Sequence, residues 1–205
     1  MPYGYLGQNT PNQTINNSGV FSITDVAELQ SQGKLGGSLE LIEEQTVSSA
    51  SVLDFTSIQG SKYDVHKIEY NLEPSNYSAL YLRLFESGVL ETASVYQYAN
   101  QFGATSGSFN DSLKSTGASF IMLNYSSQYH YVGYIYLYNL NNSSKYSFET
   151  HHTFSDDTGN SRFFFNFGGG VLPQTSTVDG IRLYPSSNTF TGSAKLYGVK
   201  EIWVT

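Results

Sequence analysis

The sequence predicts an all-β protein whose strands pack as an antiparallel sandwich or barrel. The first observation is compositional, because the 205 residues include 17 Tyr, 13 Phe and 19 Gly but only 13% charged residues. Aromatic residues favour strands, whereas surface helices are rich in Glu and Lys. The second is that short apolar segments alternate with clusters of Gly, Ser, Asn or Pro. The third is a pair of strand-like segments at the C-terminal end, the last of which we expect to complete the core.

The N-terminal residues differ from the rest of the chain. Residues 1–20 are polar, rich in Asn, Gln, Gly and Thr, and have no periodicity. Such a segment cannot form a core of its own, so we expect an extended arm that can be ordered on a neighbour in an assembly. We therefore divide the chain into an N-terminal unit over 1–35, with an anchoring role, and a β-sandwich domain over 36–205.

One short helix is predicted next to the arm. Ser22 and Asp25 form a start similar to a capping box, with Asp in place of the usual Glu or Gln. Apolar residues then recur at helical spacing, and Gly33 closes the segment. These signals predict a helix over 23–32.

The remaining segments have the period of strands. The predicted strands cover residues 39–47, 52–58, 63–70, 80–85, 93–98, 120–125, 130–140, 146–154, 162–167, 181–184 and 194–204. Their spacing, with no helical pattern between them, favours a sandwich or barrel. Leu80, Leu82 and Leu84 share one parity of their strand, so we expect all three to be buried.

The last two predicted strands are joined by residues typical of a turn. Pro185 cannot donate to a sheet ladder, and the Ser-Ser-Asn sequence after it favours a corner, which predicts a hairpin-like return. Gly198 marks a bulge or a close approach of backbones. We expect this glycine to let the sandwich close around Trp203.

Two strands carry rows of aromatic residues. Tyr134, Tyr136 and Tyr138 oppose Ile135 and Leu137, so one face of their strand is a row of tyrosines. Such a row suits a subunit interface or a surface that stacks on sugars. The simpler interpretation, which we favour on composition, is that these tyrosines cover the second sheet of the sandwich.

The second aromatic row precedes three glycines. Phe163, Phe165 and Phe167 share one parity, and Phe164 lies on the other, which predicts a strand buried on both faces. The glycines at 168–170 lack the Lys-Ser/Thr and the helix that a phosphate loop requires. We expect them to form a flexible strand connection.

Charge and cysteine content exclude several kinds of partner and site. The formal net charge of −7 and only 10 Lys and Arg residues disfavour a nucleic-acid partner. There are no cysteines, so disulfides and thiolate metal sites are excluded. No apolar segment approaches the length of a membrane span, and the first residues lack the pattern of a signal peptide. We therefore expect synthesis in the cytoplasm and no membrane insertion.

One group of residues has the types found in metal sites. His151 and His152 are followed by Asp156 and Asp157. Adjacent strand residues point to opposite faces, so the two histidines cannot bind one ion unless the strand is broken there. We expect no metal and interpret the group as a strand end followed by a turn.

The acidic residues offer the only other catalytic candidates. Glu40 and Glu44 share parity in a predicted strand that also contains Glu43, whereas a glycosidase needs two carboxylates across a cleft. Solvated charges explain them more simply. No Ser-His-Asp arrangement can be argued, and no G-x-S-x-G motif occurs. The sequence predicts no enzyme and no cofactor.

Three segments resemble a known family. YLGQNTPNQTINNSGVFSITDVAELQ (5–30), GGSLELIEEQTVSSASVLDFTSI (36–58) and IRLYPSSNTFTGSAKLYGVK (181–200) resemble virion structural proteins of tailed bacteriophages, particularly marine and cyanobacterial phages. The middle of the chain, about 63–179, is similar only in its β character. The resemblance implies a jelly-roll-like sandwich after a leader and a short helix, and it implies no active-site residues.

The resemblance also implies a role and a location. We expect a non-enzymatic virion protein, synthesised in the bacterial host cytoplasm, that is tail-associated as a tail fibre or appendage. Its expected partners are other virion proteins, further copies of the chain, with a homotrimer favoured by analogy, and a host-surface polysaccharide contacted through the tyrosine row. The alternatives are a capsid decoration protein, a stand-alone carbohydrate-binding module and a small polysaccharide depolymerase.

Overall fold

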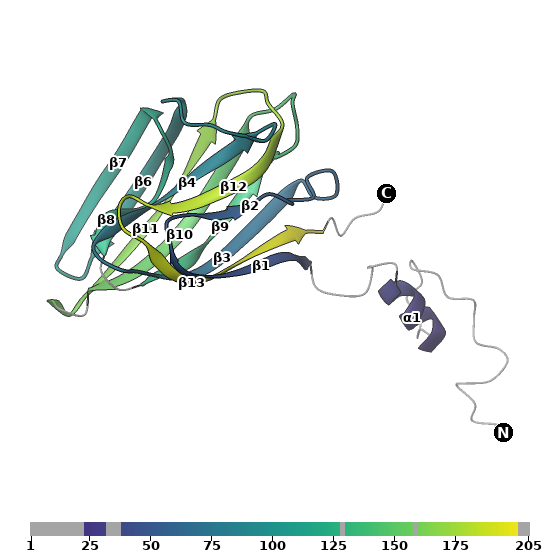
Figure 1. The fold of residues 1–205 in the computed structure, drawn as a ribbon, viewed down its shortest axis with the longest axis horizontal. Helices are drawn as coiled ribbons and strands as arrows, with labels where there is room; N and C mark the ends of the chain where they lie inside the picture. The colour runs from purple at the N-terminus through teal and green to yellow at the C-terminus, as the bar shows by residue number, and fades with distance from the viewer. Residues whose placement is uncertain (1–22, 32–37, 128–129, 158–159, 201–205) are drawn as a thin grey trace, which may run out of the picture. The chain divides into compact units, whose positions relative to one another are not determined.

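The computed structural model describes residues 23–31, 38–127, 130–157 and 160–200 (Figure 1). The chain divides into two units, residues 1–38 and 39–205. The first unit contains helix α1 (Ile23–Ser31), which confirms the predicted helix. The predicted arm, the capping residue and Trp203 lie outside the described residues. None of the described helical segments has the length and apolar character that crossing a membrane requires.

The second unit is an antiparallel β-sandwich (Figure 1). One sheet has eight strands in the order β1 (Leu39–Ala50), β13 (Phe190–Val199), β3 (Val65–Pro74), β9 (Tyr131–Tyr138), β10 (Ser147–Asp157), β11 (Arg162–Leu172), β6 (Tyr96–Ala104) and β7 (Ser108–Gly117). The other sheet has five strands, β2 (Leu53–Phe55), β12 (Val178–Pro185), β4 (Ser78–Glu86), β5 (Val89–Leu90) and β8 (Phe120–Ser127), with β8 paired to β4. The chain passes repeatedly between the sheets, as in a jelly roll. The predicted all-β, antiparallel β-sandwich is confirmed.

The core lies between the two sheets. Leu80, Leu82 and Leu84 on β4 are each at most 1% exposed, which confirms their predicted burial. Ile135 and Leu137 on β9, in the eight-stranded sheet, belong to the same core cluster and are fully buried. Burying a Leu or Ile side chain stabilises the fold by roughly 1.5–3 kcal/mol, so these rows of side chains hold the sheets together.

The predicted C-terminal hairpin is wrong. Strand β12 pairs with β2 and β4 in the five-stranded sheet, whereas β13 pairs with β1 and β3 in the other sheet. The corner after Pro185 therefore carries the chain across the sandwich instead of turning it back. Gly198 is a site of close approach, because a Cβ there would lie 2.3 Å from the ring of Tyr63.

The predicted burial of the phenylalanine row is also wrong. Phe163 and Phe167 are exposed and point away from the core, while Phe164 and Asn166 are buried. The reason is the parity of the glycines that follow on the same strand. Gly170 faces the core, where a Cβ would lie 2.7 Å from the ring of Phe120. Residues of the opposite parity must therefore point outward.

Two strands were not predicted. Strand β7 forms an edge of the eight-stranded sheet and pairs only with β6, and its sequence SFNDSLKSTG is largely polar. Strand β5 has only two residues. An edge strand with little burial lacks the apolar alternation by which strands are recognised in sequence.

Candidate functional site

The outward side of the eight-stranded sheet carries a continuous group of aromatic side chains. Because side chains alternate along a strand, β9, β10 and β11 each point every second residue outward. We call this surface the aromatic face and define it by Phe109, Leu113, Val132, Tyr134, Tyr136, Tyr138, Phe148, His152, Phe154, Phe163, Phe165 and Phe167. The register places these residues side by side: Tyr134 is opposite His152, and His152 is opposite Phe167.

The rings of the aromatic face contact one another along strands and between them. Phe165 and Phe167 lie with centroids 6.1 Å apart and planes 8° apart, and Phe163 continues the row 6.3 Å from Phe165. The ring centroid of His152 lies 5.2 Å from that of Phe154 on the same strand and 5.5 Å from that of Phe167 on the next strand. The rings therefore form one connected cluster and not scattered surface residues.

The cluster is open to solvent. Eight of its large side chains are each at least 37% exposed. Phe109 and Leu113 on β7 are the most exposed of these eight, at about two-thirds. Aromatic side chains of this exposure are ordinary when single, but a contiguous patch on a soluble domain marks an interaction site. The aromatic face is the strongest candidate for a functional surface in the described residues.

Charged side chains lie along one side of the aromatic face. Lys67 on β3 lies over Tyr134 and Tyr136, with its Nζ 5.7 and 5.8 Å from the ring centroids. It donates a hydrogen bond to Glu69 Oε1 at 2.6 Å, and this bond raises the pKa of Lys67, which keeps the ammonium charged. In the part of the chain that the structure describes, no cation lies over Phe154, Phe163 or Phe167.

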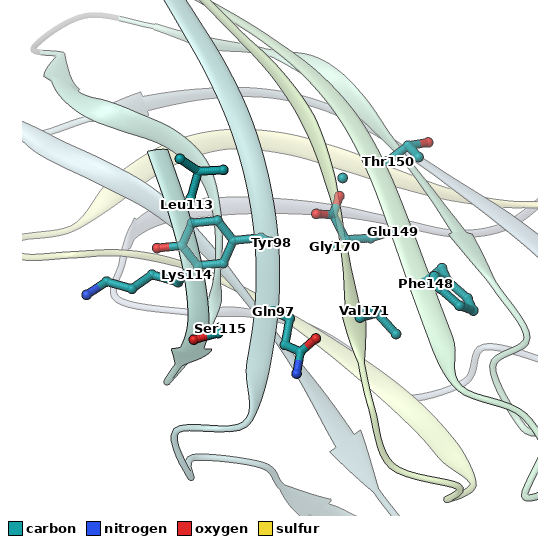
Figure 2. Close-up of a pocket in the computed structure, with 11 residues that line it drawn as sticks. Gln97, Tyr98, Leu113, Lys114, Ser115, Phe148, Glu149, Thr150, Gly170 and Val171 are labelled. Atoms are coloured by element: carbon teal, nitrogen blue, oxygen red, sulfur yellow. The ribbon is translucent and has the colours of Figure 1, made fainter. Parts of the chain in front are cut away.

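The aromatic face contains a depression with a volume of about 780 Å³. Gly169 forms part of its lining, and this position has no side chain to fill the surface between β10 and β6. Figure 2 shows Leu113 on one side of the depression and Phe148 on the other, with Val171 between them. Gln97 adds a polar group to a mostly apolar surface.

A second depression, of about 410 Å³, lies nearer β3 and β13. Its apolar walls are Tyr134 and Phe154, and its polar lining includes Glu69, Asn71 and Lys195. Apolar walls with a few converging polar groups are typical of small-ligand sites. This depression has the mixed lining that recognition of a sugar requires.

The opposite side of β10 and β11 carries buried polar groups. Glu149 Oε2 and His151 Nδ1 are 2.9 Å apart, and both side chains are fully buried. Asn166 Nδ2 donates to the Met122 carbonyl at 2.9 Å, and Asn100 Nδ2 donates to the Ile121 carbonyl at 2.7 Å. These two amides attach β8 to the eight-stranded sheet, which is a structural role.

The fold separates the residues that the sequence offered as candidates for a metal site or a catalytic pair. His151 is buried, and His152 lies on the aromatic face, so they do point to opposite sides. A register shift after Leu41 places Glu40 opposite Gly198 and Glu44 opposite Lys195. Because Gly198 faces inward and Lys195 outward, the expected shared parity of the two glutamates is wrong.

Those glutamates take part in ion pairs. Lys62 Nζ donates a hydrogen bond to Glu40 Oε1 at 2.6 Å. This bond is the main cause that lowers the pKa of Glu40 to about 2. Glu44 is 3.4 Å from Lys195. Among the described residues, no three His, Asp or Glu side chains gather in a way that could hold a metal ion.

The structure places the predicted tyrosine row within the aromatic face. Tyr134, Tyr136 and Tyr138 point outward, and Ile135 and Leu137 face the five-stranded sheet. The interpretation in which the tyrosines cover that sheet is therefore wrong. Their contact with a glycan or a subunit stays a prediction. Sequence reasoning missed the phenylalanines, although the parity of the glycines at 168–170 contained the signal.

Comparison of the chain with protein-family models, with curated proteins and with solved structures finds no match.

Proposed function

We propose that this chain is a non-enzymatic structural protein of a tailed-phage virion, tail-associated as part of a fibre or appendage, and that its sandwich binds through the aromatic face. The observation that carries the binding role is the exposure of the connected ring cluster on one side of the eight-stranded sheet. Burial of exposed aromatic surface favours association, and the freedom that the partners lose on binding offsets part of that gain. A surface of this kind is suited to binding.

The virion context rests on the segments at 5–30, 36–58 and 181–200. The division of the chain into residues 1–38 and 39–205 supports it, because an attachment protein needs a part that anchors and a part that projects. In this proposal the N-terminal unit connects to other virion proteins. The same features fit a capsid decoration protein, which differs only in its place on the particle.

The test of the virion role uses purified particles of the virus that encodes the chain. We expect mass spectrometry to detect the protein in particles banded on a density gradient, and immunogold labelling to place it on the tail. Labelling of the head would support the decoration alternative. Absence of the protein from intact particles would refute the virion role. A chain lacking residues 1–35 is expected to fold and to be lost from particles.

A stand-alone carbohydrate-binding module is the second candidate, favoured by the 410 Å³ depression. Rings stack on the apolar faces of sugars, and nearby polar groups bond to hydroxyls. A glycan array would then show saturable binding by a monomer, lost in Tyr134→Ala and retained in Tyr81→Ala on the other sheet. Failure of the monomer to bind bacterial surface polysaccharides would exclude this candidate.

A further inference from the structure

We infer that the aromatic face is the surface through which copies of this chain associate, so that its partner is the same face of another copy. The inference deepens the proposed structural role by naming a partner, and it rests on that role. The two can fail separately, because self-association is measured on the purified protein and incorporation is measured on particles.

The first argument is the size of the exposed surface. Eight large side chains are at least 37% exposed, which for side chains of roughly 150–250 Å² corresponds to roughly 500–700 Å². The half-buried rings of Tyr136, Tyr138 and Phe165 extend it. The largest patch on a typical monomer is about 300–600 Å², and each partner in a standard interface contributes about 800 Å². The aromatic face is at or above the upper end of what a monomer exposes and approaches the area that one partner contributes to a standard interface.

The second argument is the distribution of polarity. Phenylalanine and tyrosine occupy the centre of the face on β9, β10 and β11. Charged groups occur toward its sides, with Lys67, Glu69 and Lys195 on β3 and β13 and Asp111 on β7. A dry aromatic centre with a polar rim is the anatomy of protein interfaces.

The third argument is that arginine side chains cover aromatic rings on the other sheet. On the outward side of the five-stranded sheet, Arg83 lies 5.0 Å over the ring of Tyr184, and Arg182 lies 5.3 Å over the ring of Phe85. Arg182 also binds both carboxylate oxygens of Asp54, at 2.5 and 2.7 Å. The same chain therefore covers outward rings where they face water. Within the described ranges of the chain, no cation lies over the phenylalanines of the aromatic face, as expected for a surface covered by a partner.

The fourth argument is shape. The face carries both protruding side chains, Phe109 and Leu113, and a depression beside Gly169. Symmetric association requires one surface to complement itself, so that a projection on one copy enters a hollow on the other. Sheets packed face to face lie about 10 Å apart and interdigitate their side chains. Projections and a hollow on the same sheet satisfy that requirement.

The main experiment is sedimentation velocity on the full chain between about 1 and 100 µM. The wild type is expected to sediment as an oligomer, and the double variant Phe154→Lys, Phe167→Lys as a monomer with the same circular dichroism spectrum. The matched control is Tyr81→Lys, which places a charge on the outward side of β4 and is expected to leave the oligomer intact. A wild type that is monomeric at 100 µM would overturn the inference, as would a double variant that still associates.

A second measurement does not depend on folding of the charged variant. The chain has no cysteine, so Thr150→Cys places a single thiol at the 780 Å³ depression, and Thr56→Cys places one beside the other sheet. We expect the thiol at 150 to react with a maleimide at least tenfold more slowly at high than at low protein concentration, and the thiol at 56 to react equally at both. Equal reactivity of the thiol at 150 at both concentrations would overturn the inference. So would glycan binding that protects this thiol in a monomer, because it would assign the face to a sugar.

Discussion

Strands β4 and β11 both carry rows of large apolar side chains, yet the rows face in opposite directions. On β4 the leucines at 80, 82 and 84 point into the core. On β11, Phe163, Phe165 and Phe167 point outward, and the inward positions include Asn166, Gly168 and Gly170. Parity fixes which residues share a face, but not which face is buried. The residues that pack against a strand from the other sheet therefore decide which parity turns inward.

The reason for the reversal lies in β8, which contacts β10, β11 and β6 from the other sheet. Its residue Phe120 packs against Gly170, and its carbonyls accept hydrogen bonds from Asn100 and Asn166. Small and amide-bearing residues are needed beneath it. Phenylalanines in place of Asn166 and Gly170 would fill the space that β8 occupies.

The largest effect is expected from a substitution on the inward side of β11. Phe164 is 1% exposed, so Phe164→Ala is expected to lower the free energy of unfolding by about 3–5 kcal/mol. Leu82→Ala in β4 serves as the comparison and is expected to cost about 2–5 kcal/mol. Urea denaturation followed by circular dichroism measures both. A loss below about 1 kcal/mol in Phe164→Ala would show that β11 is not oriented as described.

The next effect tests the polar inward side of the same strand. Asn166→Leu removes the hydrogen bond to the Met122 carbonyl, and leaving a buried acceptor unpaired costs about 1–3 kcal/mol. The matched control is Asn71→Leu, on the exposed side of β3, which is expected to change stability by less than about 0.5 kcal/mol. Hydrogen exchange should show faster exchange in β8 in the first variant only. Unchanged protection of β8 would contradict the role of the amide.

A smaller effect is expected on the outward side of the five-stranded sheet. Arg182→Ala removes a pair with Asp54 that is about a quarter exposed and uncovers the ring of Phe85, which should cost about 1 kcal/mol. Lys195→Ala removes a more exposed pair with Glu44 and should cost at most about 0.5 kcal/mol. Thermal unfolding distinguishes the two. Equal losses would mean that the arginine cover contributes nothing beyond a surface ion pair.

A small effect on the isolated domain is also expected on the outward side of β11. Phe163 is 42% exposed, so Phe163→Thr should change monomer stability by less than about 1 kcal/mol, since Thr is also a good strand former. Urea denaturation in dilute solution, below the concentration at which copies associate, gives this value. A loss as large as that of the neighbouring Phe164→Ala would remove the distinction between the two faces.

Much of the fold follows from local sequence patterns. The helix at α1 follows from its apolar spacing and from Gly33, and most strands follow from period-two alternation between turn residues. The path of the chain after Pro185 was not predictable in this way. A polar corner looks the same whether it joins neighbouring strands or carries the chain to the other sheet. Strand β7 was missed because an edge strand buries too little to show alternation.

The candidate site was only partly predictable. The tyrosines of β9 were identified because Ile135 and Leu137 alternate with them as obvious core residues. The phenylalanines of β11 were placed on the wrong side because apolar rows usually point inward. The register of β9, β10 and β11 brings the tyrosine row and the phenylalanine row together. This long-range strand pairing leaves no signal in the local sequence. The aromatic face is a property of the assembled sheet.

The position of β13 has a consequence for how the protein is made. This strand lies between β1 and β3, so the two early strands pair with residues 190–199 and not with each other. At 5–20 residues per second, a ribosome finishes β3 roughly 6–25 s before β13. Strands that wait with unpaired edges can pair with those of other nascent chains. Slowing translation between Pro74 and Phe190 should therefore lower the yield of folded protein.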